Sequence, residues 1–420
     1  MPINDRLALA AGIGLVLPNR LLLQCGLRRR LDGWRVATGM VLRGEAATFV
    51  LSAFSIDIWS DAQPPPTLPD PQQARAHIAE RLATFLSGEK EAHVHVRREP
   101  RSDRAQRCDG PAYTVRFERW LDGAARFVRP DCWTGDDCTR TCKDNAADVL
   151  LNIVCRVRPD GVTADLWLRA NHIGIDGVPL QDIITRLQAA WGVVAAVTYP
   201  TPEEFAPHAS PRACAGRPEL AEIQAFIDFS PLLAWRQREN ARLPEAMPIA
   251  AAILWRLARH PTFAPLRIGT TVEMPAMADL GRGVGVVVVQ PAKYADRRDG
   301  LAHFVRDYND QAKLTKRRRS GGCQTLDAAA RLPARCEIAL LRHALRGDAA
   351  FGSLGFTMIR DGKIFGAPLG DVGHPHGFIA IGSVALPTPD GRRVGCVTVK
   401  GPPQRIAGYP DALRQMISAC

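Results

Sequence analysis

A histidine, an aspartate and two glycines stand close together in the segment HIGIDG, residues 172–177. The residues before it, TADLWLRA (163–170), have the composition of a β-strand, which would deliver His172 to its carboxyl end. Gly174 and Gly177 permit a tight turn there, and Asp176 can fold back to hold it. An imidazole held in this way, with one nitrogen bonded to backbone, suits general-base catalysis, which contributes about 100- to 10,000-fold in rate.

The elements on either side of this turn decide between a catalytic and a structural histidine. HxxxDG spacing also arises by chance, and a buried structural histidine is then the usual outcome. Here a β-rich strand precedes the motif, and the following residues have helical spacing, with Leu180, Ile183, Ile184 and Leu187 on one face. This strand–turn–helix context favours the catalytic interpretation.

The segment LRANHIGIDGVPLQDII (168–184) resembles the HxxxDG motif of the chloramphenicol-acetyltransferase superfamily. This superfamily includes E2 acyltransferases of 2-oxoacid dehydrogenases, plant BAHD acyltransferases, nonribosomal-peptide condensation domains and wax-ester synthases. A second segment, RGVGVVVVQPAKYADRRDGLAHFVRDYNDQAK (282–313), resembles the strand, turn and long helix of the E2 catalytic domain. FGSLGFTMI (351–359) resembles the E2 strand that comes after them.

The resemblance implies a role for each matching residue. His172 would be the general base and Asp176 a structural partner that shapes the turn by a salt bridge. Ser353 would stabilise the oxyanion, with Thr357 as the alternative; a simple turn serine before Gly355 is the competing interpretation of Ser353. No metal is expected, and no permanently bound cofactor. The donor would be acyl-CoA or an acyl carrier's phosphopantetheine.

The resemblance also implies the fold class: α/β (α+β), with two chloramphenicol-acetyltransferase-like lobes, each a mixed β-sheet flanked by helices, and an active-site channel between them. The predicted divisions are an amino-terminal lobe at 1–200, a linker with a connecting helix at 201–243, and a carboxyl-terminal lobe at 244–420. The Pro-rich stretch 198–218 marks the boundary. The corresponding second-lobe turn, KGPPQRI (400–406), offers no base, so one active site per chain is expected.

One departure from the family pattern keeps two alternatives open. The BAHD sequence DFGWG is absent; the nearest text is IFGAPLGDVG (364–373). One alternative is a condensation enzyme that forms an amide or ester bond from a donor tethered to a carrier protein. The other is a non-catalytic scaffold or subunit-binding protein that keeps the fold. The expected partners are therefore a small-molecule acyl acceptor and, for the condensation alternative, an acyl carrier protein.

Charge and composition narrow the ligand class. The 420 residues carry 54 Lys+Arg against 43 Asp+Glu, a net charge of +11, which favours anionic partners. The helix-end cluster Lys313, Lys316, Arg317 and Arg318 could hold phosphates of coenzyme A, or could simply complement the helix carboxyl end. No nucleic-acid-binding motif is recognisable. No apolar run reaches the roughly 20 residues of a membrane span, and no signal peptide is expected, so the predicted location is the cytoplasm.

Two further clusters invite a metal interpretation. Cys132, Cys138 and Cys142 match no standard zinc spacing, and the eleven cysteines are expected to be reduced thiols. His374 and His376 in GHPHG (373–377) suggest a metal site or a second base, but a glycine-flanked loop before a strand is the preferred interpretation.

Overall fold

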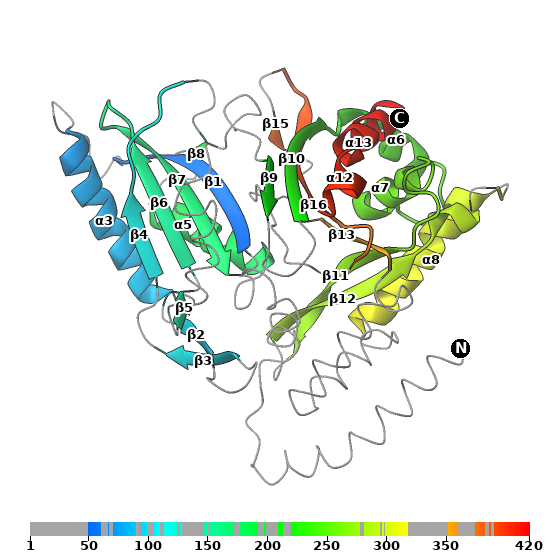
Figure 1. Ribbon diagram of the computed structural model, residues 1–420, viewed down its shortest axis with the longest axis horizontal. Coiled ribbons are helices and arrows are strands. Elements are labelled where there is room, and N and C mark those ends of the chain that lie inside the picture. Colours follow the sequence, from blue (N-terminus) through cyan, green and yellow to red (C-terminus); the bar gives the residue numbers. More distant parts are fainter. Residues whose placement is uncertain are drawn as a thin grey trace, which may run out of the picture.

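The structure is a computed structural model of the 420-residue chain. The residues that it describes are 49–59, 66, 70–89, 92, 94–98, 105–109, 113–123, 127, 147–149, 151–171, 177–191, 197–198, 209–212, 220–277, 281–294, 296–297, 299–317, 352–358, 374–382, 386–387 and 390–420. Within them the chain forms two lobes, each built on its own β-sheet (Figure 1).

The first lobe contains a five-stranded sheet in the order β4-β6-β7-β1-β8. Its strands are β1 (Phe49–Asp57), β4 (Tyr113–Phe117), β6 (Leu151–Val157), β7 (Thr163–Asn171) and β8 (Val197–Thr198). The central strand β7 is antiparallel to both neighbours, β1 and β6, whereas the edge strand β4 runs parallel to β6. A separate three-stranded sheet has the order β3-β2-β5 and consists of β2 (Val94–Arg98), β3 (Ala105–Asp109) and β5 (Ala147–Val149).

Two helices cover one face of the five-stranded sheet, α3 (Pro71–Gly88) and α5 (Gly177–Ala190). The α3 helix begins where Asp70 accepts a hydrogen bond from the Gln73 backbone N–H at 3.4 Å, with proline in the first turn. Its buried residues recur every four positions and so form one apolar stripe: Ala74, Ile78, Leu82 and Leu86. The stripe packs with alternate residues of β1, β6 and β7 into a single core.

The second lobe contains an eight-stranded sheet in the order β12-β11-β13-β14-β16-β10-β9, with β15 paired to β16. Its strands are β9 (Ala209–Arg212), β10 (Leu220–Asp228), β11 (Ile268–Met277), β12 (Gly281–Val289), β13 (Leu354–Met358), β14 (Phe378–Ile381), β15 (Leu386–Pro387) and β16 (Arg393–Gly401). The sheet is mixed, because β13 is parallel to both β11 and β14 while the other pairs are antiparallel.

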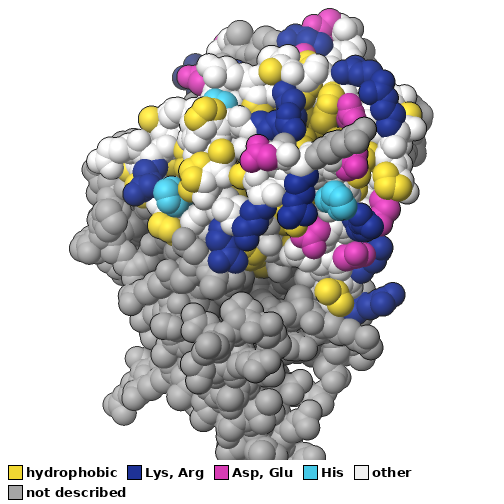
Figure 2. Space-filling view, turned by 90° about the vertical axis from the view of Figure 1, so that its right-hand side faces the viewer, with side chains coloured by type: hydrophobic (Ala, Val, Ile, Leu, Met, Phe, Trp, Pro, Cys, Tyr) yellow, Lys and Arg dark blue, Asp and Glu magenta, His cyan; other side chains and the backbone are white. Residues whose placement is uncertain are grey.

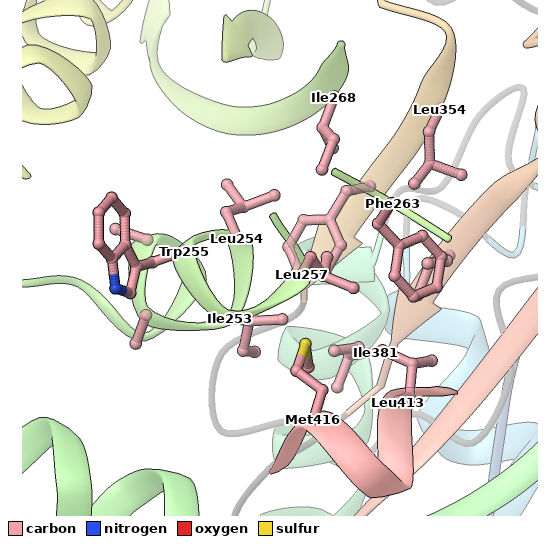
Figure 3. Close-up of a cluster of buried hydrophobic side chains, with 14 of the residues drawn as sticks. Ile253, Leu254, Trp255, Leu257, Phe263, Ile268, Leu354, Ile381, Leu413 and Met416 are labelled. Atoms are coloured by element: carbon pink, nitrogen blue, oxygen red, sulfur yellow. The ribbon is translucent and has the colours of Figure 1, made fainter. Parts of the chain in front are cut away.

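The helices of the second lobe lie on the side of its sheet that is turned away from the first lobe (Figure 1). They are α6 (Ser230–Asn240), α7 (Ile249–Leu257), α8 (Gly300–Lys316), α12 (Pro403–Ile406) and α13 (Tyr409–Ser418), with the 3-10 turn η5 (Pro291–Tyr294). The central helix α7 is apolar almost throughout, since it is buried among α6, α8, α13 and the sheet. Figure 3 shows its residues Leu254 and Leu257 facing Phe263, Ile268 and Leu413 in this core.

Two sequence-based expectations differ from the structure. Residues 201–243, predicted as a linker with a connecting helix, contribute β9, β10 and α6 to the second sheet and its helical layer. The unbroken valines in the strand RGVGVVVV (282–289) predict burial on both faces of the sheet, which is wrong. It is the edge strand β12, in which Val287 and Val289 are buried while Val286 and Val288 are partly exposed. In the described part of the chain, no helix combines the length and apolar character needed to cross a bilayer.

Candidate active site

The HxxxDG turn lies between two elements that the structure defines on both sides. β7 ends at Asn171, paired with Phe49 of β1, and α5 begins at Gly177. His172 and Asp176 themselves fall within residues 172–176, outside the described residues. The predicted strand before the motif and the predicted helix after it are therefore present, and position 172 is next in the sequence after the last residue of β7, a central strand of the sheet.

Side chains on the helix-free face of the first sheet fix β7 between its neighbours. Ser55 and Asp165 stand opposite each other in the β1–β7 pair, and the Ser55 hydroxyl donates to Asp165 Oδ1 at 2.6 Å. Arg158 Nη2 donates to the same carboxylate oxygen at 3.1 Å. Asp165 is 1% exposed, so both bonds are shielded from water and stronger than they would be at a surface. They hold the register of the strand that leads to position 172.

An ion pair anchors the helix that follows the motif. The guanidinium of Arg186 in α5 donates to the Glu89 carboxylate through Nε (2.9 Å to Oε1) and Nη2 (2.6 Å to Oε2). Such a two-point contact fixes the relative orientation of the two side chains as well as the distance between them. Because Glu89 follows α3 directly, the contact ties the two helices of the first lobe together. Both elements that flank residues 172–176 are thus held by side-chain contacts in addition to backbone pairing.

The helix-free face of the second sheet carries a row of small and polar residues. Thr357, Ala380, Thr398 and Gln224 are successive register partners across β13, β14, β16 and β10. Thr398 and Gln224 are only 2% and 4% exposed, although the helices cover the opposite face. Other parts of the chain must therefore cover this row. Buried polar groups in such a row need hydrogen-bond partners, which the covering parts of the chain can supply.

The two hydroxyl groups that the sequence offered as oxyanion donors have different surroundings. Ser353 is buried, and its Oγ lies 3.2 Å from both the backbone N–H and the carbonyl of Arg267, accepting from the first and donating to the second. Its proton is thus engaged by the backbone of the residue before β11. Thr357 Oγ1 lies 2.5 Å from Thr271 Oγ1 on the helix-free face, and either hydroxyl can be the donor.

The cationic cluster at the end of α8 is exposed. Lys313, Lys316 and Arg317 occupy the last turn and the residue after it, and Lys313 Nζ is 3.3 Å from Asp310 Oδ1. The fourth expected cation, Arg318, lies outside the described residues. Figure 2 shows that Lys and Arg side chains on the outer side of this lobe alternate with Asp and Glu. The arrangement accommodates both original interpretations, a phosphate contact and a solvated helix end.

The helix itself packs on the covered face of the second sheet. Phe304, Val305 and Tyr308 belong to the core between α8 and the strands, so the sheet separates α8 from Thr357. A phosphate held at the end of α8 would therefore have to reach Thr357 around the edge strand β12.

His374 is one of the two histidines for which the sequence suggested a metal site or a second base, with a glycine-flanked loop as the preferred interpretation. Its ring packs against Phe378 on the same face as Thr357, with ring centroids 5.8 Å apart. The nearest sequence signal was the GHPHG segment itself; the contacts that place the ring come from residues about 20 positions earlier. The cysteines at 132, 138 and 142 lie outside the described residues, and no group of three possible metal ligands occurs within them.

Known proteins were compared at the level of sequence and of structure. No family profile and no curated protein matches the sequence. Among solved structures, the fold is similar to that of the trichothecene 15-O-acetyltransferase TRI3 from Fusarium sporotrichioides, with a TM-score of 0.56 and 12% identity over 93% of this chain and 95% of that one. The epimerization domain from the third module of tyrocidine synthetase B matches with a TM-score of 0.52 and 10% identity, covering 90% and 92% of the two chains.

A third solved structure is TRI101 from F. sporotrichioides in complex with coenzyme A and T-2. It matches with a TM-score of 0.50 and 10% identity over 89% of this chain and 95% of that one. At 10–12% identity these similarities show the fold. The predicted two-lobed α/β architecture, with two sheets flanked by helices, is therefore confirmed, and it is the architecture of these acetyltransferase and peptide-synthetase structures.

Proposed function

We propose that this chain transfers an acyl group from a thioester, acyl-CoA or an acyl carrier, to a hydroxyl, amine or thiol acceptor, with His172 as general base. The observation that carries the proposal is the coincidence of two independent features. The fold matches an acetyltransferase over nearly its whole length, and the HxxxDG motif falls directly after the central strand of the first lobe. The proposed site lies between the two lobes.

The reaction follows from the residue types. His172 takes the proton of the acceptor, whose oxygen, nitrogen or sulfur then forms a bond to the thioester carbonyl carbon. The carbonyl electron pair moves to oxygen and gives a tetrahedral oxyanion. As that pair returns, the C–S bond breaks, and the departing thiolate takes the proton from the imidazolium. Asp176 does not exchange a proton; it holds the turn so that the imidazole meets both partners.

The developing oxyanion requires a preorganised hydrogen-bond donor, which in known cases contributes about 3–4 kcal/mol. Ser353 remains a candidate by its resemblance to the E2 serine, but its proton would first have to leave the Arg267 carbonyl. Thr357 and Thr271 make a second candidate, because they share a hydrogen bond on the helix-free face and either proton can turn toward a ligand. We favour the threonine pair for that reason.

A carrier-tethered donor is the second candidate function. The fold of the peptide-synthetase epimerization domain matches that of this chain over 90% of its length. This similarity supports a site that accepts phosphopantetheine on a carrier protein. TRI101, by contrast, was solved with coenzyme A. The chemistry at His172 is the same in both cases. Only the group beyond the pantetheine arm differs.

Calorimetric titration with coenzyme A, with pantetheine and with phosphopantetheine-loaded acyl carrier protein tests these candidates. If α8 holds the nucleotide phosphates, the double variant Lys316→Ala, Arg317→Ala should raise the Kd for coenzyme A about 2- to 30-fold, since exposed ion pairs contribute about 0.2–1 kcal/mol each. Pantetheine lacks those phosphates, so its Kd should not change. Lys293→Ala, another exposed lysine, is the matched control.

Three outcomes are informative. Binding of coenzyme A supports a free acyl-CoA donor, and binding of the loaded carrier alone supports the condensation function. If neither binds the unaltered protein, acyl transfer is contradicted and the scaffold alternative gains support.

A further inference from the structure

Trp59 joins the end of β1 to the hairpin between β6 and β7 and to helix α3. Its Nε1 donates to the Gly161 carbonyl at 2.8 Å, and the neighbouring Ile58 N–H donates to the Val162 carbonyl at 2.8 Å. On the α3 side, the ring of His77 stacks on the ring of Trp59, with centroids 4.7 Å apart and planes inclined by 19°. The stack therefore connects the first half of α3 to the end of the sheet whose core the helix covers.

One nitrogen of the His77 ring is cut off from water. Nε2 is shielded from solvent, and no group in the described part of the chain lies within hydrogen-bonding distance of it. A neutral imidazole has one nitrogen without a hydrogen, whereas an imidazolium carries an N–H on both nitrogens. Protonation of His77 would thus leave a charged ring with a buried donor that has neither water nor an acceptor, which is unfavourable.

Arg81 places a positive charge one helical turn from His77. Residues four apart are neighbours on the surface of a helix. The guanidinium of Arg81 is held in position, because its Nη2 donates to the Ala190 carbonyl at 3.0 Å and its Cζ lies 4.8 Å from the centroid of the Trp191 ring. A protonated His77 would therefore meet a fixed charge of the same sign.

These surroundings lower the pKa of His77. Burial of the ring is the largest cause, and the charge of Arg81 is the second. The Glu80 carboxylate and a hydrogen bond to the Ile58 backbone raise the pKa, but by less. Arg81 and Glu80, the charged groups that act on the ring, both belong to α3; within the described residues, the end of β1 presents the Ile58 backbone and the uncharged ring of Trp59.

We propose that His77 is a pH-sensitive latch of the first lobe: its neutral ring holds the first half of α3 against the end of β1, and protonation releases the helix. A group whose pKa is lower in the packed state takes up a proton more readily when the contact opens. The latch is therefore fully stable above the ordinary histidine pKa of about 6.5 and weakens as the pH falls below that value. This inference does not depend on acyl transfer.

NMR of protein isotopically labelled at histidine Cε1 measures the titration of His77. The resonance absent from His77→Phe belongs to His77, and its midpoint should lie below about pH 6.5. Arg81→Gln removes the neighbouring charge and should move this midpoint upward. Arg75→Gln is the matched control and should leave the midpoint unchanged, because Arg75 is an exposed arginine of the same helix, two positions before His77, and does not face the ring.

Hydrogen exchange followed by mass spectrometry measures the release of α3. After correction for the intrinsic pH dependence of exchange, the amides of residues 71–88 should exchange faster at about pH 5.5 than at about pH 7.5. This increase should be about 3-fold larger in the unaltered protein than in His77→Phe, whose ring can stack but cannot titrate. Helix α13 of the second lobe should show no such difference between the two proteins.

Three results would overturn the inference. They are a His77 midpoint at or above the ordinary value, unchanged exchange of α3 in the unaltered protein, and an equal acid-induced increase in His77→Phe. If His77→Phe does not fold, the resonance that responds to Arg81→Gln but not to Arg75→Gln identifies His77. The absence of any such resonance would then also refute the latch.

Discussion

His172→Ala is expected to lower kcat for acyl transfer about 100- to 10,000-fold, the usual contribution of a positioned general base. The loss should appear in kcat, with the Kd for the thioester donor unchanged, because the imidazole acts on the proton that moves in the transition state. The fold should persist, since the described pairing of β7 with β1 ends at Asn171 and α5 begins at Gly177. Stopped-time assays of thiol release, with circular dichroism on the same samples, measure both properties.

Asp176→Asn provides the comparison for this first prediction. A residue that only holds the turn should affect activity and thermal stability together, whereas His172→Ala should affect activity alone. Full activity in His172→Ala would remove the proposed mechanism.

Phe356→Ala should produce the largest loss of stability. Phe356 is fully buried in β13, whose register partners are Thr270 of β11 and Ile379 of β14 on its two sides. Removing a buried phenyl ring leaves a cavity and costs about 3–5 kcal/mol, a large part of a typical net stability of about 5–15 kcal/mol. The midpoint of urea unfolding should fall accordingly. Activity should fall too, because the same strand carries Thr357 on its other face.

Leu314→Ala is the matched control for this stability prediction. Leu314 is the large hydrophobic side chain that is 46% exposed in α8, so its removal creates no cavity. It should change the free energy of unfolding by less than about 0.5 kcal/mol. Equal losses in the two variants would contradict the packing described for β13.

Local patterns predicted many of the elements correctly. In QQARAHIAERLATFLSG (72–88), the spacing of Ile78, Leu82, Phe85 and Leu86 predicts a helix that closes on Gly88, and α3 runs from Pro71 to Gly88. The strand before the HxxxDG motif and the helix after it were likewise recognisable. In each case the information lies within about ten residues, as hydrophobic period, capping residue or terminal glycine.

The role of residues 201–243 could not be predicted in this way. In β10 the polar Glu222 and Gln224 alternate with Ile223 and Ala225, and the polar residues are the more deeply buried ones. β10 pairs with β16, in which the buried Lys400 and Thr398 stand opposite them. This pairing joins segments far apart in the sequence. The polar, Pro-rich stretch at residues 198–218 therefore made this part of the chain look like a linker.

The residues of the candidate site differ in the same way: some could be predicted from the local sequence and others could not. The HxxxDG spacing is local and visible in the sequence. The placement of His374 depends on a hydrogen bond to Gly352 and on the space left by Gly355, which the order of residues does not reveal. The sequence favoured Ser353 over Thr357 as the oxyanion donor. Their partners in the structure differ: a backbone carbonyl for Ser353 and a second hydroxyl for Thr357.

A crystal structure of the protein soaked with coenzyme A tests the central claim most directly. If a histidine between two half-molecules drives acyl transfer, the cofactor's sulfur should stand next to the ring at position 172, at or near hydrogen-bonding distance, with its pantetheine arm passing between the lobes. An imidazole enclosed in packed protein, or coenzyme A bound with its thiol remote from that ring, would contradict the account.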